Sequence, residues 1–189
     1  MGSRCTRNCR FCAVTEGPLE PLDPQEPAKV ANVARKMGLK YVVVTSVTRD
    51  DLPDGGAGIF ADTIEKIRQE IPDVCVEVLI PDFMGQEEAL RKVAKACPDV
   101  INHNIETVSR LYSLVRPQAE YRRSLWILSK VSEHYPNIYT KSGIMLGLGE
   151  KPEEVRHTMK DLLAAGCRIL TVGQYLQPSK DHLKVQRFV

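Results

Sequence analysis

The chain alternates between β-branched runs and segments with helical spacing of apolar residues, and this alternation limits the fold more than any other feature. Five runs predict strands: 41–47, 74–80, 100–106, 138–148 and 168–176. Amphipathic segments lie between them, and one more precedes the first run. Strands joined through helices form parallel sheets with crossover connections. The pattern therefore predicts an α/β fold, either an open doubly wound sheet or a barrel-like (β/α) array.

Some local details follow from residue type. The valine-rich run at 41–47 is predicted to be a buried strand. Asp23 is predicted to cap the first helix, with Pro24 in its first position and Gly38 after its end. Apolar residues at helical spacing mark the inner face of that helix: Val30, Val33, Ala34 and Met37. In the helix that opens at Pro152 they are Val155, Met159, Leu162 and Leu163.

Composition places the chain among ordinary globular proteins. Its 189 residues carry a net charge of +2 and 43% hydrophobic residues, which is enough for one core. A nearly neutral net charge gives no indication of broad electrostatic binding to nucleic acid or to a membrane surface. No apolar run reaches the roughly 18 residues of a membrane span. We expect a single domain over 1–189 and a cytoplasmic location, with an organellar one as the alternative. No glycine-rich dinucleotide fingerprint follows the first strand, which argues against a Rossmann site.

Six cysteines divide into a scattered group and a clustered group. The scattered three, Cys75, Cys97 and Cys167, lie beside apolar residues and are predicted to pack in the core, as free cysteine commonly does. A disulfide scaffold is disfavoured, because such proteins are short, loop-rich and secreted. The cysteines are therefore expected to be free thiols or metal ligands.

The clustered three form the segment Cys5-x3-Cys9-x2-Cys12, which places soft sulfur ligands close together. Zinc usually takes four ligands, often as two C-x2-C pairs, and the sequence offers neither a second pair nor a nearby histidine. Three thiolates on a cubane [4Fe–4S] cluster leave one iron open for a substrate or cofactor. Exposed thiols without a metal oxidise readily. The spacing therefore favours an iron–sulfur cluster, with zinc as the alternative.

Further motifs follow in register with the cysteine segment. Together they are 5–12 (CTRNCRFC), 44–56 (VTSVTRDDLPDGG), 102–106 (NHNIE), 115–117 (VRP), 140–150 (TKSGIMLGLGE) and 173–179 (GQYLQPS). On these motifs the chain resembles the radical S-adenosylmethionine (SAM) enzymes, and more narrowly the lipoyl synthases, over essentially its whole length. The resemblance implies a partial (β/α)6 barrel of the radical SAM type, with its first strand largely missing and the domain truncated at both ends.

By this resemblance, Cys5, Cys9 and Cys12 would hold a [4Fe–4S] cluster whose open iron binds the amino and carboxylate groups of SAM. Electron transfer from the cluster would cleave SAM to methionine and a 5′-deoxyadenosyl radical. The radical would take hydrogen atoms from C6 and C8 of an octanoyl chain on a protein lysine, and sulfur would be inserted there. The implied partners are an octanoylated carrier protein, either a lipoyl domain or a glycine-cleavage carrier, and an electron donor. Neither nucleic acid nor membrane is expected as a partner.

The resemblance also implies residues that bind SAM, and it assigns no catalytic residue beyond the cluster ligands. After the first strand the implied residues are Thr45, Ser46, Asp50 and Asp51, with Gly55 and Gly56 allowing a close approach of the backbone. At later strand ends they are Asn104, Glu106, Lys141, Gly147 and Gln174, and Gly149 is implied as a positioning residue together with Gly147 and Gln174. Arg116 and Lys141 would meet a carboxylate or the carrier peptide. The alternative is that these are solvated acids, loop residues and ordinary surface charges.

Two features depart from the lipoyl synthase pattern. Those enzymes carry an auxiliary [4Fe–4S] cluster, their sulfur source, on an upstream C-x4-C-x5-C motif and a C-terminal Arg-Ser-Ser-Tyr segment. Here four residues precede Cys5, and the chain stops at Val189. We therefore expect a fragment that cleaves SAM poorly or not at all and does not insert sulfur alone. The alternatives are another sulfur-inserting radical SAM enzyme, similar to biotin synthase, and an inactive cluster-binding fragment.

Overall fold

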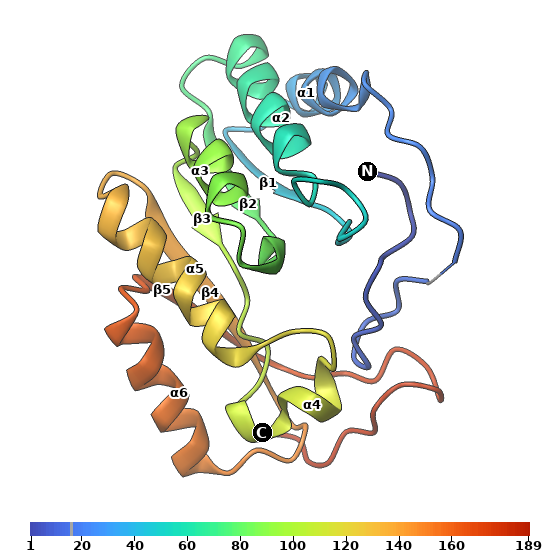
Figure 1. Cartoon of the computed structure of the whole chain (residues 1–189), viewed down its shortest axis with the longest axis vertical. Helices are drawn as coiled ribbons and strands as arrows, with labels where there is room; N and C mark the ends of the chain where they lie inside the picture. Colours follow the sequence, from blue (N-terminus) through green and yellow to red (C-terminus); the bar gives the residue numbers. More distant parts are fainter. Residues whose placement is uncertain (16) are drawn as a thin grey trace.

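The computed structural model describes residues 1–15 and 17–189, and its centre is one five-stranded parallel sheet (Figure 1). The strands are β1 (Tyr41–Thr45), β2 (Cys75–Leu79), β3 (Val100–Asn102), β4 (Tyr139–Leu146) and β5 (Ile169–Gln174). Each strand pairs with the next one in the chain, so the spatial order is β1-β2-β3-β4-β5. A doubly wound sheet reverses its order at a switch point, whereas a (β/α) barrel keeps the order of the chain. The five predicted strands are confirmed, and the sheet is of the barrel type.

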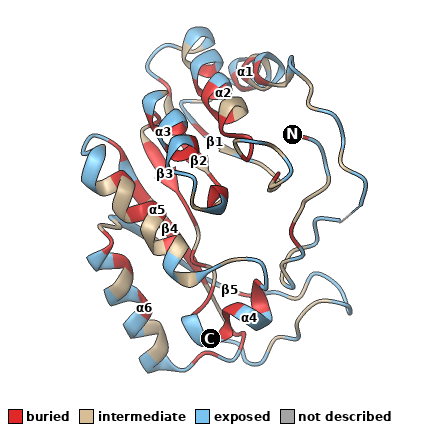
Figure 2. Ribbon diagram, in the orientation of Figure 1, coloured by how far each residue is buried: buried red, intermediate tan, exposed pale blue. Residues whose placement is uncertain are grey.

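Helices connect the strands and lie along one side of the sheet (Figure 1). They are α1 (Glu26–Lys36), α2 (Ala57–Glu70), α3 (Glu87–Lys95), α4 (Tyr112–Val115), α5 (Tyr121–His134) and α6 (Pro152–Ala164), with single 3-10 turns η1 (Phe83–Gly85) and η2 (Ser109–Leu111). Figure 2 shows that their buried residues face the strands while their outward sides are exposed. In the described part of the chain, no helix is both long and apolar enough to cross a lipid bilayer. The segments before α1 and after β5 run along the other side of the molecule (Figure 1).

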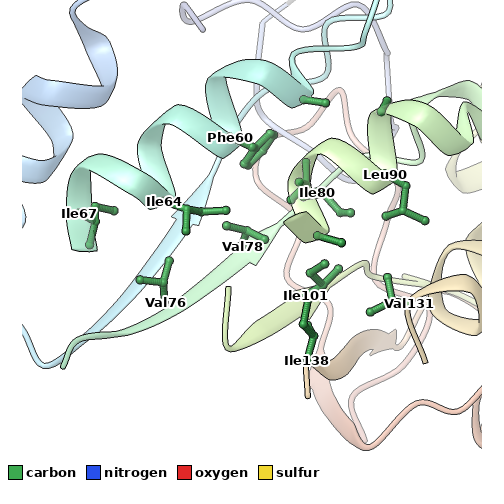
Figure 3. Packing of buried hydrophobic residues seen from close by; sticks show 14 of the residues in the cluster. Phe60, Ile64, Ile67, Val76, Val78, Ile80, Leu90, Ile101, Val131 and Ile138 are labelled. Carbon is green, nitrogen blue, oxygen red and sulfur yellow. The ribbon is translucent and has the colours of Figure 1, made fainter. Parts of the chain in front are cut away.

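A large part of the core lies between α2 and the sheet (Figure 3). On α2, Phe60, Ile64 and Ile67 recur at helical spacing and are at most 1% exposed. They pack towards Val76 and Val78 of β2, which are 0% exposed. Full burial of a side chain of this size contributes about 1.5–3 kcal/mol. The amphipathic pattern that predicted this helix therefore also fixes it to the sheet.

The prediction of a buried strand at 41–47 is wrong for one face of that strand. Along β1, Val42 is 6% exposed whereas Val43 is 54% exposed. Helices cover one face of the sheet, the other face points into the open interior, and β1 lies at the sheet edge. A run of valines is compatible with a strand that is buried on both faces and with one that is buried on one face only. Residue type alone does not determine which face the helices cover.

Asp23 does not cap α1. The helix begins at Glu26 instead, and the proline in its first turn is Pro27. The Asp23 carboxylate accepts a hydrogen bond from the Gln25 amide at 2.9 Å, which closes a turn ahead of the helix. Gly38 follows the end of the helix with φ +66°, as predicted.

The inner faces predicted for the first and last helices are too wide. Half of the eight residues assigned to them are exposed: Val33, Met37, Met159 and Leu163. On α1, burial falls on Ala31 and Ala34, which are 0% and 4% exposed, where the helix packs beside α2. Small side chains allow a close approach along a narrow stripe, so apolar spacing alone overestimated the width of the contact.

Cys97 is exposed, so the prediction that it packs in the core is wrong. Helix α3 ends at Lys95, and Cys97 lies beyond it with φ +53°. The helical spacing that placed this thiol on the buried face therefore does not extend to its position. Cys75 and Cys167 are partly buried, in fair agreement with a packing role.

Candidate functional site

A cavity of about 200 Å³ opens where the cysteine-bearing loop meets the carboxyl ends of the strands. Cys5, Cys9 and Cys12 all line it. The sheet side contributes residues at or after the ends of β1, β2 and β3: Thr45, Ser46, Ile80, Pro81, His103, Asn104 and Glu106. The carboxyl ends of the strands are where (β/α) barrels keep their active sites. The structure therefore brings the three predicted ligands together with four of the residues predicted to bind SAM.

Backbone hydrogen bonds hold the cysteine loop against two other segments. The Thr6 amide donates to the Thr48 carbonyl at 3.0 Å, beyond the end of β1. The Arg10 amide donates to the Val115 carbonyl at 2.9 Å, at the end of α4. The Thr48 amide also donates to Cys5 Sγ at 3.3 Å. The positions of the thiols are therefore set by the fold around them as well as by the spacing of the cysteines.

The segment after β5 contacts the same loop from its other side. His182 Nε2 lies 2.9 Å from the carbonyl oxygen of Cys12, and the Leu183 amide donates to the Arg10 carbonyl at 3.1 Å. The Tyr175 hydroxyl donates to the Leu183 carbonyl at 2.7 Å and fixes this segment to the end of β5. Sequence reasoning gave His182 no role, since nothing near it in the sequence predicts a contact with the cysteine loop.

The three thiols form a donor set that suits an iron–sulfur cluster. Across the described residues, no three His, Cys, Asp or Glu side chains converge closely enough to hold one metal ion, although Cys5, Cys9 and Cys12 line the same cavity. Three thiols that line one cavity suit a multi-iron cluster, in which different sulfurs bind different irons. Burial raises the pKa of the Cys9 thiol, and the Arg116 guanidinium partly offsets that shift. Ligation to iron would replace the thiol proton, and the metal would supply the counter-charge of the buried sulfur.

Arg116 is buried beside Asn104 and Glu106 and does not lie on the surface. It is 9% exposed, and its Nη1 donates to the Asn104 carbonyl at 2.9 Å. Burial raises the pKa of Glu106, and the positive charge of Arg116 opposes that shift. Asn104 Oδ1 and Arg116 Nε are both buried without a hydrogen-bond partner among the described residues. Both residues line the cavity, and because buried polar atoms are ordinarily paired, these two unpaired atoms mark this wall as a candidate for contact with a polar ligand.

His103 lies at the inner wall of the cavity and is 2% exposed. Its Nδ1 donates to the Ile80 carbonyl at 2.8 Å, because a carbonyl only accepts, and its Nε2 accepts from the Ser124 hydroxyl at 3.0 Å. Burial lowers the pKa of His103 to about 4, and the positive charge of Arg116 acts in the same direction. His103 is therefore a neutral link between β2, β3 and α5 at physiological pH.

This lowered pKa predicts that the folded chain loses stability on mild acidification. The unfolded chain binds a proton at His103 near the ordinary pKa of about 6.5, whereas the folded chain resists it until about pH 4. Above pH 6.5 His103 is neutral in both states, and the folded chain keeps its full stability. As the pH falls from about 6.5 to about 4, only the unfolded chain binds the proton, so the free energy of unfolding decreases. We expect His103 to make the chain about 2 kcal/mol less stable at pH 5 than at pH 7. Urea unfolding at both values measures the difference, and in a His103→Gln variant the difference should shrink by about that amount; an unchanged difference would refute the prediction.

Asp50 and Asp51 follow β1, but their carboxylates bind arginines and do not line the cavity. Asp50 accepts from Nε and Nη2 of Arg7 at 2.7 and 2.9 Å. Asp51 accepts from Nε and Nη2 of Arg49, both at 2.8 Å. These two acids are therefore engaged in holding the loops around the site.

Gly55 and Gly56 are predicted to let SAM approach the backbone closely. In the structure the groups that lie close to them are side chains of this chain, Phe83 and Met1. They adopt φ values of +61° and +87°, a region that favours glycine. A Cβ at Gly55 would lie 2.9 Å from the Phe83 ring, and one at Gly56 would lie 2.3 Å from Met1 Sδ. Neither glycine lines the cavity.

Lys141, Gly147 and Gln174 also lie away from the cavity. Lys141 Nζ is 2.8 and 3.0 Å from the two carboxylate oxygens of Glu77, inside the sheet. Gln174 Nε2 donates to the Arg187 carbonyl at 3.2 Å, and a Cβ at Gly147 would lie 2.4 Å from that same nitrogen. Gly147 and Gln174 therefore position the segment after β5.

Sequence reasoning gave no role to Arg7, although it lies between Cys5 and Cys9. Its side chain is only 4% exposed and reaches Asp82, the residue that opens η1 after β2. An arginine inside a cysteine segment was a usable signal. Its partners could not be read from spacing, because they follow two different strands.

Comparisons with known proteins agree with this arrangement. A family model described as the Radical SAM superfamily matches residues 1–162. Lipoyl synthases from Caldanaerobacter subterraneus subsp. tengcongensis and Desulfotalea psychrophila are 62% and 57% identical over 189 residues, covering 100% of this chain. This chain spans only 66% and 63% of the length of those two proteins.

Solved structures show the same fold at low sequence identity. Streptococcus suis SuiB bound to S-adenosylmethionine matches with a TM-score of 0.77 and 10% identity, over 98% of this chain and 42% of that one. HydG, a maturase of the [FeFe]-hydrogenase, matches with a TM-score of 0.76 and 19% identity, over 97% of this chain and 44% of that one. Both matches support the partial barrel.

Proposed function

The chain belongs to the radical SAM superfamily, and since its whole length aligns with lipoyl synthases at 62% and 57% identity, we propose that it carries the core of a lipoyl synthase. The proposed reaction is sulfur insertion at C6 and C8 of an octanoyl group on a carrier protein. Because the chain spans 66% and 63% of those relatives, the carrier, the electron donor and a cytoplasmic location are parts of this proposal.

The observation that carries the proposal is the single cavity shared by the cysteines and the strand ends. Cys5, Cys9 and Cys12 line it together with Asn104 and Glu106. Glu106 adopts φ +63°, a costly conformation for a residue other than glycine and one that is common at functional sites. A cluster loop placed over the carboxyl ends of parallel strands is the arrangement that this chemistry requires.

The residues of this chain would bind the cofactors and shield them. The three cysteines would hold the [4Fe–4S] cluster, which together with SAM supplies the one-electron chemistry that activates C–H bonds. Asn104 and Arg116, which line the cavity, would contact the polar end of SAM. The rest of the wall is largely apolar and would exclude water from the reacting carbon atoms: Phe11, Val14, Val47, Leu79 and Ile80.

The proposal is tested by reconstituting the chain anaerobically with iron and sulfide. We expect about four iron ions and four sulfides per chain, with the absorbance of a [4Fe–4S] cluster. Addition of SAM and a reductant should then produce 5′-deoxyadenosine slowly, since the chain spans only 66% and 63% of the lipoyl synthases it matches, and an octanoylated lipoyl domain should accelerate its formation. Dethiobiotin serves as the control substrate, because a biotin-synthase-like enzyme would respond to it instead.

Each outcome bears on the proposal. Colourless protein that holds one zinc ion would overturn it in favour of a zinc module. A filled cluster that never yields 5′-deoxyadenosine would favour a cluster-binding protein without the reaction. Acceleration by dethiobiotin but not by the octanoylated domain would reassign the substrate. Hydrogen abstraction from the octanoyl chain, detected by mass spectrometry with a deuterated substrate, supports the proposal directly.

A further inference from the structure

We propose that Arg7 is a positioning residue that fixes the cysteine loop to the ends of two strands and thereby sets the geometry of the cluster ligands. This inference rests on the proposed function, because it concerns the same cluster. It goes beyond that function by assigning a positioning role to Arg7, which lines the cavity while its guanidinium pairs with two carboxylates of this chain.

The guanidinium of Arg7 is buried and is engaged through its Nε and Nη2. Its Nε and Nη2 donate to the two carboxylate oxygens of Asp50 at 2.7 and 2.9 Å, and Nη2 also donates to Asp82. Nη2 lies 3.3 Å from Met84 Sδ. The side chain is 4% exposed, although its neighbours Asn8 and Arg10 are exposed. One side chain thus connects the loop to the segments after β1 and after β2.

The partner Asp82 depends on this contact. It is 0% exposed, and besides Arg7 it accepts from the Met84 amide at 3.1 Å and from Arg123 at a longer 3.4 Å. Burial raises the pKa of Asp82, but the hydrogen bond from Arg7 is the largest of several effects that together hold the pKa below its usual value. A buried carboxylate with such a partner is costly to disturb, so the position of Arg7 is strongly determined.

The charge of Arg7 is compensated by two carboxylates, which leaves no net positive charge for a ligand. Among the described residues of loop 5–12, the ion pairs are formed by the Arg7 side chain. The bidentate contact with Asp50 needs the planar guanidinium of an arginine. A lysine ammonium cannot donate to both oxygens of Asp50 and also to Asp82 in fixed directions. The geometry therefore predicts that Arg7→Lys keeps the charge and loses the positioning.

The first test measures the cluster. Wild type, Arg7→Lys, Asp82→Asn and the control Arg10→Lys are reconstituted, and the rate of iron loss to an excess of chelator is followed anaerobically. We expect iron loss to be about 10-fold faster or more in Arg7→Lys and Asp82→Asn, in line with other outer-shell changes. We also expect an altered electron paramagnetic resonance signal of the reduced cluster. Arg10→Lys, changed at an exposed side chain of the same loop, should stay within about two-fold of wild type.

The second test needs no cluster and separates positioning from loss of the fold. In the apo chain, alkylation of each cysteine is followed by mass spectrometry, with exposed Cys97 as the internal reference. We expect Arg7→Lys to accelerate the alkylation of Cys5 and Cys9 while that of the partly buried Cys167 is unchanged. Wild-type rates of both iron loss and alkylation in Arg7→Lys would overturn the inference, as would acceleration at all cysteines, which indicates general unfolding. If wild type binds no cluster, the proposed function fails, and the alkylation result still decides the role of Arg7.

Discussion

Replacing Cys9 by serine is expected to abolish iron binding by the chain and, with it, the cleavage of SAM. Cys9 lines the cavity beside Cys5 and Cys12, and burial raises the pKa of its thiol. A serine hydroxyl at this position stays protonated and cannot replace the thiolate as a soft ligand to iron. Outer-shell changes at metal sites already cost about 10- to 100-fold, so removal of a ligand should exceed about 100-fold. Iron content after anaerobic reconstitution and 5′-deoxyadenosine formation measure the two effects.

Cys97→Ser is the matched control for this substitution. Cys97 is exposed and lies outside the cavity, so its replacement should leave iron content and 5′-deoxyadenosine formation unchanged. A Cys9→Ser chain that still binds about four iron ions and cleaves SAM at the wild-type rate would contradict the assignment of the ligands. Equal losses in both variants would point to a general sensitivity of the chain and also contradict it.

Replacing Lys141 by methionine is expected to destabilise the fold by about 3 to 4 kcal/mol, since it leaves Glu77 as a buried carboxylate without its cation. The side chain of Glu77 is 1% exposed, and that of Lys141 is 20% exposed. Burial raises the pKa of Glu77, but the hydrogen bond from Lys141 is the largest of several effects that together hold the pKa below its usual value. For a chain of this size the midpoint of thermal unfolding should fall by about 10 °C. Calorimetry or circular dichroism measures the shift.

Two further variants show whether the effect comes from the ion pair. Adding Glu77→Gln to Lys141→Met should recover at least half of the loss, because no charge is then left buried. Lys160→Met, at an exposed lysine on α6, should change the midpoint by less than about 2 °C. A Lys141→Met chain with the wild-type midpoint but weaker SAM binding would contradict the structural role and return Lys141 to the candidate site.

Some of the site residues could be predicted from the sequence. Those near strand ends could be placed, whereas those that depend on partners far away in the sequence could not. Asn104 and Glu106 come shortly after β3, Thr45 ends β1 and Ser46 follows it, so the carboxyl ends of a parallel sheet place them near one another. Asp50 and Asp51 follow the same strand, yet arginines bind both of them outside the cavity. Their residue type suits a ligand site equally well, and only the folded chain shows the arginines that bind them.

The sequence by itself determined the parallel α/β order and the three-cysteine segment, because both depend on spacing within a few residues. Tertiary structure decided which face of β1 is covered and which acids hold the cysteine loop. Arg7 meets Asp50 and Asp82 across separations of 43 and 75 residues. Such partners are fixed by the order and register of the strands, which bring together the ends of β1 and β2. Local periodicity carries no information about that pairing. The contacts of Arg7 with Asp50 and Asp82 are therefore seen only in the folded chain.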